Sequence, residues 1–222
     1  MILKRLGLAL ALVAGTALLA ALLIAPASAA AMEKGTTLLS VQLMHGDADF
    51  ATPEVFDPGS ITAYDHSEWG GQLMLQHMVS PKWALALSAA IGTFKETDEA
   101  GTNALPNTPD FVYSQSSFNG RFGFDRFVSI ADDVSIYMGP GLQFWTGKGK
   151  FDDGSSPEIE SESTTRIAMS GRIGANVALG TSVGLNGYMG CYIGKASADD
   201  QGAKASWTPS GSDGAVGVSF KF

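Results

Sequence analysis

Apolar and polar residues alternate with period two along most of this chain. The clearest stretch places Phe118, Phe122 and Phe124 on one side, while Arg121 and Asp125 fall on the other. Such alternation is typical of a β-strand with one apolar and one polar face. The alternating stretches predict strands at 36–45, 63–79, from 83 onward, and at 112–127, 134–146, 166–179, 183–193 and 214–222.

The connections between these strands alternate between short turns and long polar loops. Short turns are expected at 80–82, 129–133 and 180–181, and long loops at 46–61, 95–110, 147–162 and 195–210. This layout predicts an all-β fold, an eight-stranded antiparallel up-and-down transmembrane β-barrel with short periplasmic turns and four long outer loops. Proline removes a ladder donor, so we expect a bulge or kink at Gly139-Pro140-Gly141.

The first residues have the features of a targeting segment. Lys4 and Arg5 precede a long apolar run, and Pro26 is followed by an Ala-x-Ala site that ends at Ala29. This order predicts a cleaved signal peptide at 1–29, which leaves a barrel domain at 30–222. The apolar run approaches the length of a membrane span, so an uncleaved anchor is the alternative.

The chain ends on its most apolar strand, whose face carries Val216, Val218, Phe220 and Phe222. The spacing of Gly217, Phe220 and Phe222 resembles the C-terminal signal of outer-membrane proteins. That resemblance implies recognition by the barrel-assembly machinery. In a membrane barrel the last strand must also pair with the first, because an open edge is not tolerated in lipid.

The layout and this signal together make the mature chain resemble the small eight-stranded bacterial outer-membrane barrels, the OmpX-, OmpA-barrel- and OmpW-like proteins. The resemblance implies a location in the outer membrane of a Gram-negative bacterium, in contact with its lipids and lipopolysaccharide, and we expect a monomer. The alternative is a soluble β-sandwich or a lipocalin-like barrel with its apolar face inward. The many charges on the polar face disfavour that alternative.

The polar face carries five charged residues that would meet inside the barrel. An eight-stranded barrel is just wide enough for side chains to fill it. Buried charges require partners, so Asp125 and Glu68 are candidate partners for the arginines. We therefore expect an internal polar network that plugs the lumen, with a narrow ion path as the alternative. Its predicted members are Glu68, Arg121, Asp125, Arg166 and Arg172.

Aromatic residues are expected at the two membrane interfaces, where barrels carry aromatic girdles. Trp83, Phe124 and Phe222 would lie near the periplasmic rim. Trp69 and Phe144 would lie near the outer rim.

Charge limits the possible partners. The chain carries a net charge of −8, which becomes −10 without Lys4 and Arg5, and this argues against nucleic acid. The long loops hold 15 of the 22 acidic residues, most densely at Asp152, Asp153, Glu158, Glu160 and Glu162. Their spacing matches no EF-hand loop, so we predict a solvated acidic surface and no metal or cofactor. Ions that bridge these loops to lipopolysaccharide phosphates are a further hypothesis.

Two features suggest chemistry only weakly. Asp65-His66-Ser67 looks like a fragment of a hydrolase site, but adjacent strand residues point to opposite faces and cannot form a relay. Cys191 is the single cysteine and falls on the apolar face, where it acts as a small hydrophobe. We therefore predict a non-enzymatic barrel with an envelope-structural or surface-interaction role. The alternatives are a narrow channel for small solutes and, third, a lipid-modifying enzyme.

Overall fold

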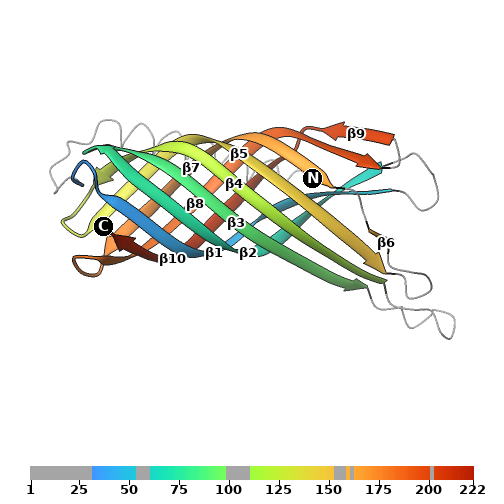
Figure 1. The fold of residues 1–222 in the computed structure, drawn as a ribbon, viewed down its shortest axis with the longest axis horizontal. Helices are drawn as coiled ribbons and strands as arrows, with labels where there is room; N and C mark the ends of the chain where they lie inside the picture. The colour runs from blue at the N-terminus through green and yellow to red at the C-terminus, as the bar shows by residue number, and fades with distance from the viewer. Residues whose placement is uncertain (1–31, 54–60, 99–110, 153–158, 161–162, 201–202) are drawn as a thin grey trace, which may run out of the picture.

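The chain forms a single β-barrel with tilted strands (Figure 1). It was obtained as a computed structural model, which describes residues 32–53, 61–98, 111–152, 159–160, 163–200 and 203–222. The predicted signal peptide at 1–29 lies outside the described residues and stays a prediction. The described residues contain no helix long and apolar enough to cross a membrane. The strands are β1 (Thr37–Pro53), β2 (Ile61–Ser80), β3 (Trp83–Asp98), β4 (Phe111–Ser129), β5 (Val134–Asp152), β6 (Ile159–Glu160), β7 (Thr164–Ala178), β8 (Val183–Asp200), β9 (Ala203–Trp207) and β10 (Ser210–Lys221).

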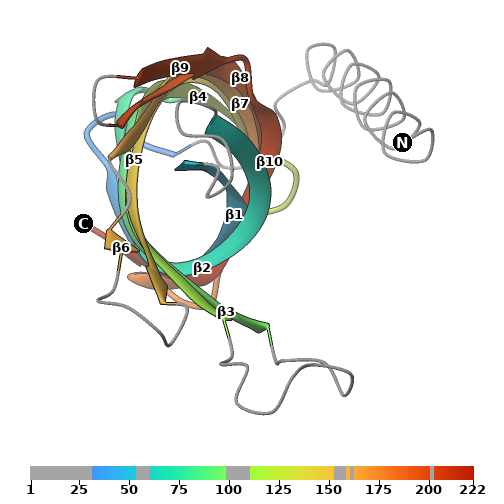
Figure 2. The same ribbon diagram turned by 90° about the vertical axis from the view of Figure 1, so that its right-hand side faces the viewer.

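The sheet closes on itself, as the end-on view in Figure 2 shows. Each strand pairs antiparallel with its neighbour, and β10 pairs with both β1 and β8. The short β9 pairs with the last residues of β8, beyond the part of β8 that pairs with β10. The two-residue strand β6 pairs with the end of β5. The described strands therefore occupy eight positions in the wall, and the prediction of an eight-stranded antiparallel barrel is confirmed.

The C-terminal residue completes the closure. The backbone N–H of Phe222 donates to the carbonyl of Thr37 at 2.9 Å, and the N–H of Thr37 donates back at 3.0 Å. The register continues from Leu38 opposite Lys221 to Gly46 opposite Asp213. Because the last strand is bonded on both sides, the membrane-spanning part of the wall has no open edge at this seam.

The two ends of the barrel differ. One end, here called the turn end, carries the short connections β2–β3, β4–β5 and β7–β8 together with Phe222. The opposite end, the loop end, carries the connections whose residues are only partly described. In outer-membrane barrels the short turns are periplasmic and the long loops face outward.

Strands at the loop end are longer than the alternating pattern predicted. The predicted loop at 195–210 was wrong, because β8 continues to Asp200 and forms a hairpin with β9. The other predicted loops also begin or end inside strands, since β1 runs to Pro53, β3 to Asp98 and β5 to Asp152. Backbone pairing needs no apolar face, so it continues beyond the point where the hydrophobic alternation stops.

A bulge or kink was predicted at Gly139-Pro140-Gly141, and the bulge was wrong, whereas the kink stays a prediction. Pairing between β4 and β5 stops after Gly123 opposite Gly141 and resumes with Arg126 opposite Met138 in the same register. No residue is inserted, so the wall has a local lapse in pairing where proline lacks its N–H. The backbone approaches closely here, since a Cβ on Gly139 would lie 1.7 Å from the Phe124 carbonyl oxygen.

Side chains alternate between lipid and lumen as the sequence predicted. The apolar residues of the outer face are broadly exposed, for example Val41 at 52% and Met189 at 75%. Polar residues on the inner face are buried, and Gln76 and Asp125 are both 0% exposed. An apolar exterior around a polar interior excludes the soluble sandwich and the lipocalin-like barrel.

Candidate functional site: the cross-linked lumen

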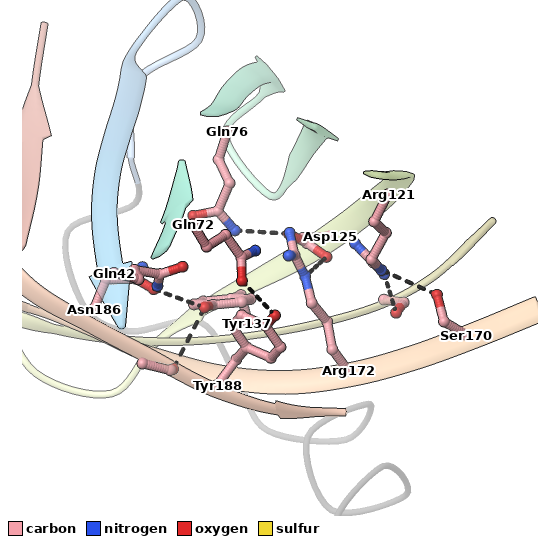
Figure 3. A network of polar contacts seen from close by, with 12 residues as sticks. Gln42, Gln72, Gln76, Arg121, Asp125, Tyr137, Ser170, Arg172, Asn186 and Tyr188 are labelled. Atoms are coloured by element: carbon pink, nitrogen blue, oxygen red, sulfur yellow. Dashed lines mark hydrogen bonds and ion pairs between the residues drawn. The ribbon is translucent and has the colours of Figure 1, made fainter. Parts of the chain in front are cut away.

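A buried ion pair lies inside the lumen (Figure 3). The Arg172 guanidinium on β7 donates from Nη2 to Asp125 Oδ2 at 2.6 Å and from Nε to Oδ1 at 3.2 Å. Gln76 on β2 donates to the same Oδ2 at 2.6 Å. All three side chains are buried. The bidentate geometry is the strongest form of an arginine–carboxylate pair, and it links three strands that are not neighbours.

A second set of hydrogen bonds crosses the lumen beside this ion pair (Figure 3). Asn186 on β8 accepts from the Tyr137 hydroxyl at 2.9 Å and from the Gln42 amide at 2.8 Å. Tyr188 on the same strand donates to Gln72 Oε1 at 2.8 Å. These bonds connect β8 to β5, β1 and β2, so strands that are not neighbours in the sheet are linked through side chains.

Buried apolar side chains, here called the floor, pack together inside the lumen toward the turn end. Tyr137 stacks on Phe127 with ring centroids 5.3 Å apart, next to Leu38 and Met78. Gly174 makes room for the tyrosine, because a Cβ there would lie 2.5 Å from the Tyr137 hydroxyl oxygen. The floor is therefore packed from apolar groups, whereas the ion pair and its hydrogen-bonded neighbours are polar.

A third group lies closer to the loop end. Glu68 accepts hydrogen bonds from Trp145 Nε1 at 3.1 Å and from the Ser117 hydroxyl. Arg166 donates to the Tyr192 hydroxyl at 2.7 Å, and its guanidinium lies 3.9 Å from the Tyr192 ring centroid and 5.4 Å from that of Trp145. These buried aromatic and charged groups fill the lumen on the loop side of the ion pair.

Arg121 is held differently from the other two arginines. Its Nε donates to the Ser170 hydroxyl at 3.1 Å, and its Nη2 donates to the carbonyl of Gly139 at 3.0 Å. Both partners are neutral. Gly141 is required beneath it, since a Cβ there would lie 2.7 Å from Arg121 Cζ.

All five charged residues that the sequence placed in the lumen are buried there. The structure brings Asp125 together with Arg172, whereas the described contacts give Arg121 no carboxylate partner. Sequence reasoning did not include Asp213, which accepts from Gln143 Nε2 at 3.3 Å. Extending the alternation of β10 back from Ala215 by two residues would have placed Asp213 on the inner face. The neutral partners Gln42, Gln72, Gln76 and Tyr137 could not be singled out, because a period-two pattern gives a face and no contact.

The five predicted girdle residues all lie on the outer face. Trp83 and Phe222 are near the turn end, and Trp83 is opposite Arg126 in the register between β3 and β4. Trp69 is opposite His45, and the two rings are 4.4 Å apart. Their role at the membrane interfaces stays a prediction, as does the assembly role of Gly217, Phe220 and Phe222. The exposed fractions are 56% for Trp69, 45% for Trp83, 46% for Phe124, 42% for Phe144 and 75% for Phe222.

The weaker candidates gain no site. His66 and Ser67 lie in β2, but their side chains are outside the described part of the structure. His77, near the turn end, is hydrogen-bonded to the Thr37 hydroxyl at 2.9 Å. Cys191 is exposed on the outer face, and among the described residues no group of three or more potential ligands could hold a metal ion. The densest acidic group, at 152–162, has no described side chains.

Comparisons with known proteins agree with this architecture. The family model of the outer membrane protein β-barrel domain matches residues 16–222. Among solved structures, OprG from Pseudomonas aeruginosa is 13% identical, with a TM-score of 0.56 and coverage of 88% of this chain and 99% of OprG. No curated protein sequence matches significantly.

Two further solved structures are similar at a lower level. Ail, the attachment invasion locus protein of Yersinia pestis, is 11% identical, with a TM-score of 0.49 and coverage of 85% of this chain and 99% of Ail. Neisserial surface protein A is 14% identical, with a TM-score of 0.43 and coverage of 85% of this chain and 100% of that protein. The family match, which spans nearly the whole chain, assigns this protein to the outer membrane protein β-barrel domain family and places it in the bacterial outer membrane.

Proposed function

We propose that this protein is a non-enzymatic outer-membrane barrel with a closed lumen and an envelope-structural or surface-interaction role. The observation that carries the proposal is the cross-linking of the lumen by buried side chains. The buried Asp125–Arg172 pair and the floor around Tyr137 and Phe127 support the proposal. A barrel filled in this way presents its outer loops on a rigid support and offers solutes no continuous aqueous path.

Planar-bilayer recording of the refolded mature chain tests this proposal. We expect no reproducible conductance steps from the wild-type barrel. A triple variant with Tyr137→Ala, Asp125→Ala and Arg172→Ala serves as the control for insertion into the bilayer. It removes large buried groups from both the floor and the ion pair, so an inserted variant should conduct. Steps from the variant and silence from the wild type support a plugged barrel. Reproducible steps from the wild type would overturn it.

A narrow channel is the second candidate function, and one observation favours it. A cavity of about 240 Å³ opens at the turn end, where its lining includes Leu38, Ser135, Asn176 and Lys221. These residues belong to the inner faces of four strands, so the cavity is the mouth of the lumen below the floor. If the wild type conducts, Lys221→Glu should change its selectivity toward cations, because the substitution reverses a charge at that mouth.

The proposal excludes enzymatic activity, and this part needs a separate test. The refolded protein would be incubated with lipopolysaccharide and phospholipid, and acyl gain or loss would be followed by mass spectrometry. We expect no change in either lipid. An acyl transfer or hydrolysis that disappears in the His66→Ala and Ser67→Ala variants would contradict the proposal. The same activity surviving both variants would place the enzyme site elsewhere.

We further propose that membrane lipids and lipopolysaccharide contact the outer face, and that the assembly machinery reads the last strand. The exposed Phe220 and Phe222 side chains support the second part. Deleting Phe222 should reduce the folded, heat-modifiable fraction in the outer membrane of producing cells. Lys221→Gln, which leaves Gly217, Phe220 and Phe222 unchanged, is the matched control. Equal assembly of all three proteins would argue against this signal.

A further inference from the structure

Arg121 is a buried cation that forms no ion pair with the residues that the structure describes. Arg121 is only 7% exposed, and its described hydrogen bonds go to the neutral oxygens of Ser170 and Gly139. The third nitrogen of its guanidinium, Nη1, has no hydrogen-bond partner within the described structure. A buried charge held only by neutral groups is costly, because the protein interior replaces water poorly around an ion.

A second donor of the same kind lies nearby. Asp125 uses Nε and Nη2 of Arg172, which leaves Arg172 Nη1 without a hydrogen-bond partner in the described part of the chain. Arg172 is opposite Gly139 in the register between β5 and β7, and Arg121 donates to the Gly139 carbonyl, so the two like-charged side chains lie in the same part of the lumen. Figure 3 draws both arginines, with Arg172 reaching Asp125 and Arg121 reaching Ser170.

Two glycines in the barrel wall allow the Arg121 guanidinium to lie close to the backbone. A Cβ on Gly141 would lie 2.7 Å from its Cζ, and a Cβ on Gly123 would lie 3.0 Å from the free Nη1. Any larger residue at either position would displace the guanidinium. At positions 123 and 141 the wall therefore consists of backbone alone, and no side chain from these positions covers Arg121 Nη1.

We propose that a small monovalent anion, a halide or a carboxylate, binds between Arg121 and Arg172 and accepts hydrogen bonds from both Nη1 groups. Such bonds are charge-assisted, and they would also offset the repulsion between the two guanidiniums. Asp125 and Asp213 add negative charge to the same region, which disfavours a divalent anion. Anion binding at this site does not require that the lumen conducts. The conductance experiment and the anion-binding experiment can therefore fail independently.

Asp213 offers a competing explanation. Its carboxylate carries a negative charge inside the lumen, but it is bonded to Gln143 and makes no described ion pair with Arg121. If Asp213 alone balanced Arg121, no anion would be needed. The two explanations make opposite predictions for Asp213→Asn, which removes a competing negative charge in one case and the counter-charge of Arg121 in the other.

Bromide is the probe, because it scatters anomalously and resembles chloride. Crystals of the wild-type barrel grown in sodium bromide should show an anomalous peak within hydrogen-bond distance of Arg121 Nη1 and Arg172 Nη1. In detergent solution, the unfolding midpoint should rise with bromide when a bulky sulfonate salt keeps the ionic strength constant. An absent peak together with equal midpoints in the two salts would overturn the proposal.

Two variants and one control complete the solution experiment. Arg121→Gln should lose the bromide dependence, and Asp213→Asn should reach half of the effect at a lower bromide concentration. Arg126→Gln, on the same strand but on the outer face with Phe124, should respond like the wild type. If Arg121→Gln keeps the full bromide response, the anion binds elsewhere and the assignment is wrong. If Asp213→Asn abolishes the response, Asp213 and not an anion balances Arg121.

Discussion

The inner and outer faces of the barrel wall are built on different rules, and β5 carries both within a few residues. Leu142 is 59% exposed toward lipid, whereas its neighbour Gln143 is 2% exposed and reaches Asp213 across the lumen. The outer residues need only be apolar, because an apolar side chain that faces lipid needs no particular partner. The inner residues need particular partners, since an unpaired polar group in a closed lumen is costly. Many apolar residues therefore suit an outer position, whereas each inner position requires a particular residue.

The largest effect is expected from breaking the central ion pair. Arg172→Ala leaves the Asp125 carboxylate buried at 0% exposure with only Gln76 as a described partner. Removing one partner of a buried pair costs about 3–5 kcal/mol, because an uncompensated charge remains. Urea unfolding of the barrel from lipid vesicles, followed by tryptophan fluorescence, measures this loss.

A double variant distinguishes a lost charge balance from lost packing. Asp125→Leu together with Arg172→Met removes both charges and keeps comparable side-chain volume. Replacing both partners with apolar groups is often close to neutral, so most of the stability should return. If the double variant is as unstable as Arg172→Ala, then packing and not charge dominates at the centre of the lumen.

A charge on the outer face should cost somewhat less. Leu142→Arg places a guanidinium on the lipid side of β5, where Leu142 is opposite Phe122. An arginine near the membrane midplane of a barrel costs about 2–4 kcal/mol, and less toward the interfaces. Leu142→Ala is the control, because it stays apolar. Equal stability of the two variants in vesicles would mean that this face does not contact hydrocarbon.

The division of the two faces was predictable from the sequence, and the contacts were not. Period-two alternation placed Phe122 outside and Arg121 inside because the strand geometry leaves no other choice. It could not show that Asp125 pairs with Arg172 while Arg121 bonds to Ser170 and a backbone carbonyl. Those choices depend on strand register and tilt, which bring side chains from distant parts of the chain to the same height.

The ends of the strands were also less predictable than their centres. Hydrophobic alternation exists where a strand must face lipid, so it stops at the membrane boundary. The hairpin of β8 with β9 continues beyond the end of the hydrophobic alternation, from Ala196 opposite Trp207 to Asp200 opposite Ala203. A polar sequence gives no periodic signal for such pairing, which is why this segment was expected to be a loop.

A backbone contact gives the next prediction. Gly139→Ala should destabilise the barrel, because the added Cβ would lie 1.7 Å from the Phe124 carbonyl oxygen in the wall. Overpacking of this kind costs about 1–3 kcal/mol. Gly171→Ala is the matched control: this glycine lies opposite Pro140, and its added Cβ would meet nothing within 4 Å. Similar unfolding midpoints for both variants would show that the lapse in pairing near Pro140 absorbs the extra atom.

The smallest effect is expected from a single neutral hydrogen bond in the lumen. Tyr188→Phe keeps the ring but removes the hydroxyl that donates to Gln72 Oε1 at 2.8 Å, and that acceptor stays buried. The loss should be about 1 kcal/mol. Thr37→Val removes the exposed hydrogen bond to His77 and should cost less, because water can replace the hydroxyl. An equal or larger loss for Thr37→Val would contradict the view that the closed lumen, rather than hydrogen bonding in general, makes the inner partners specific.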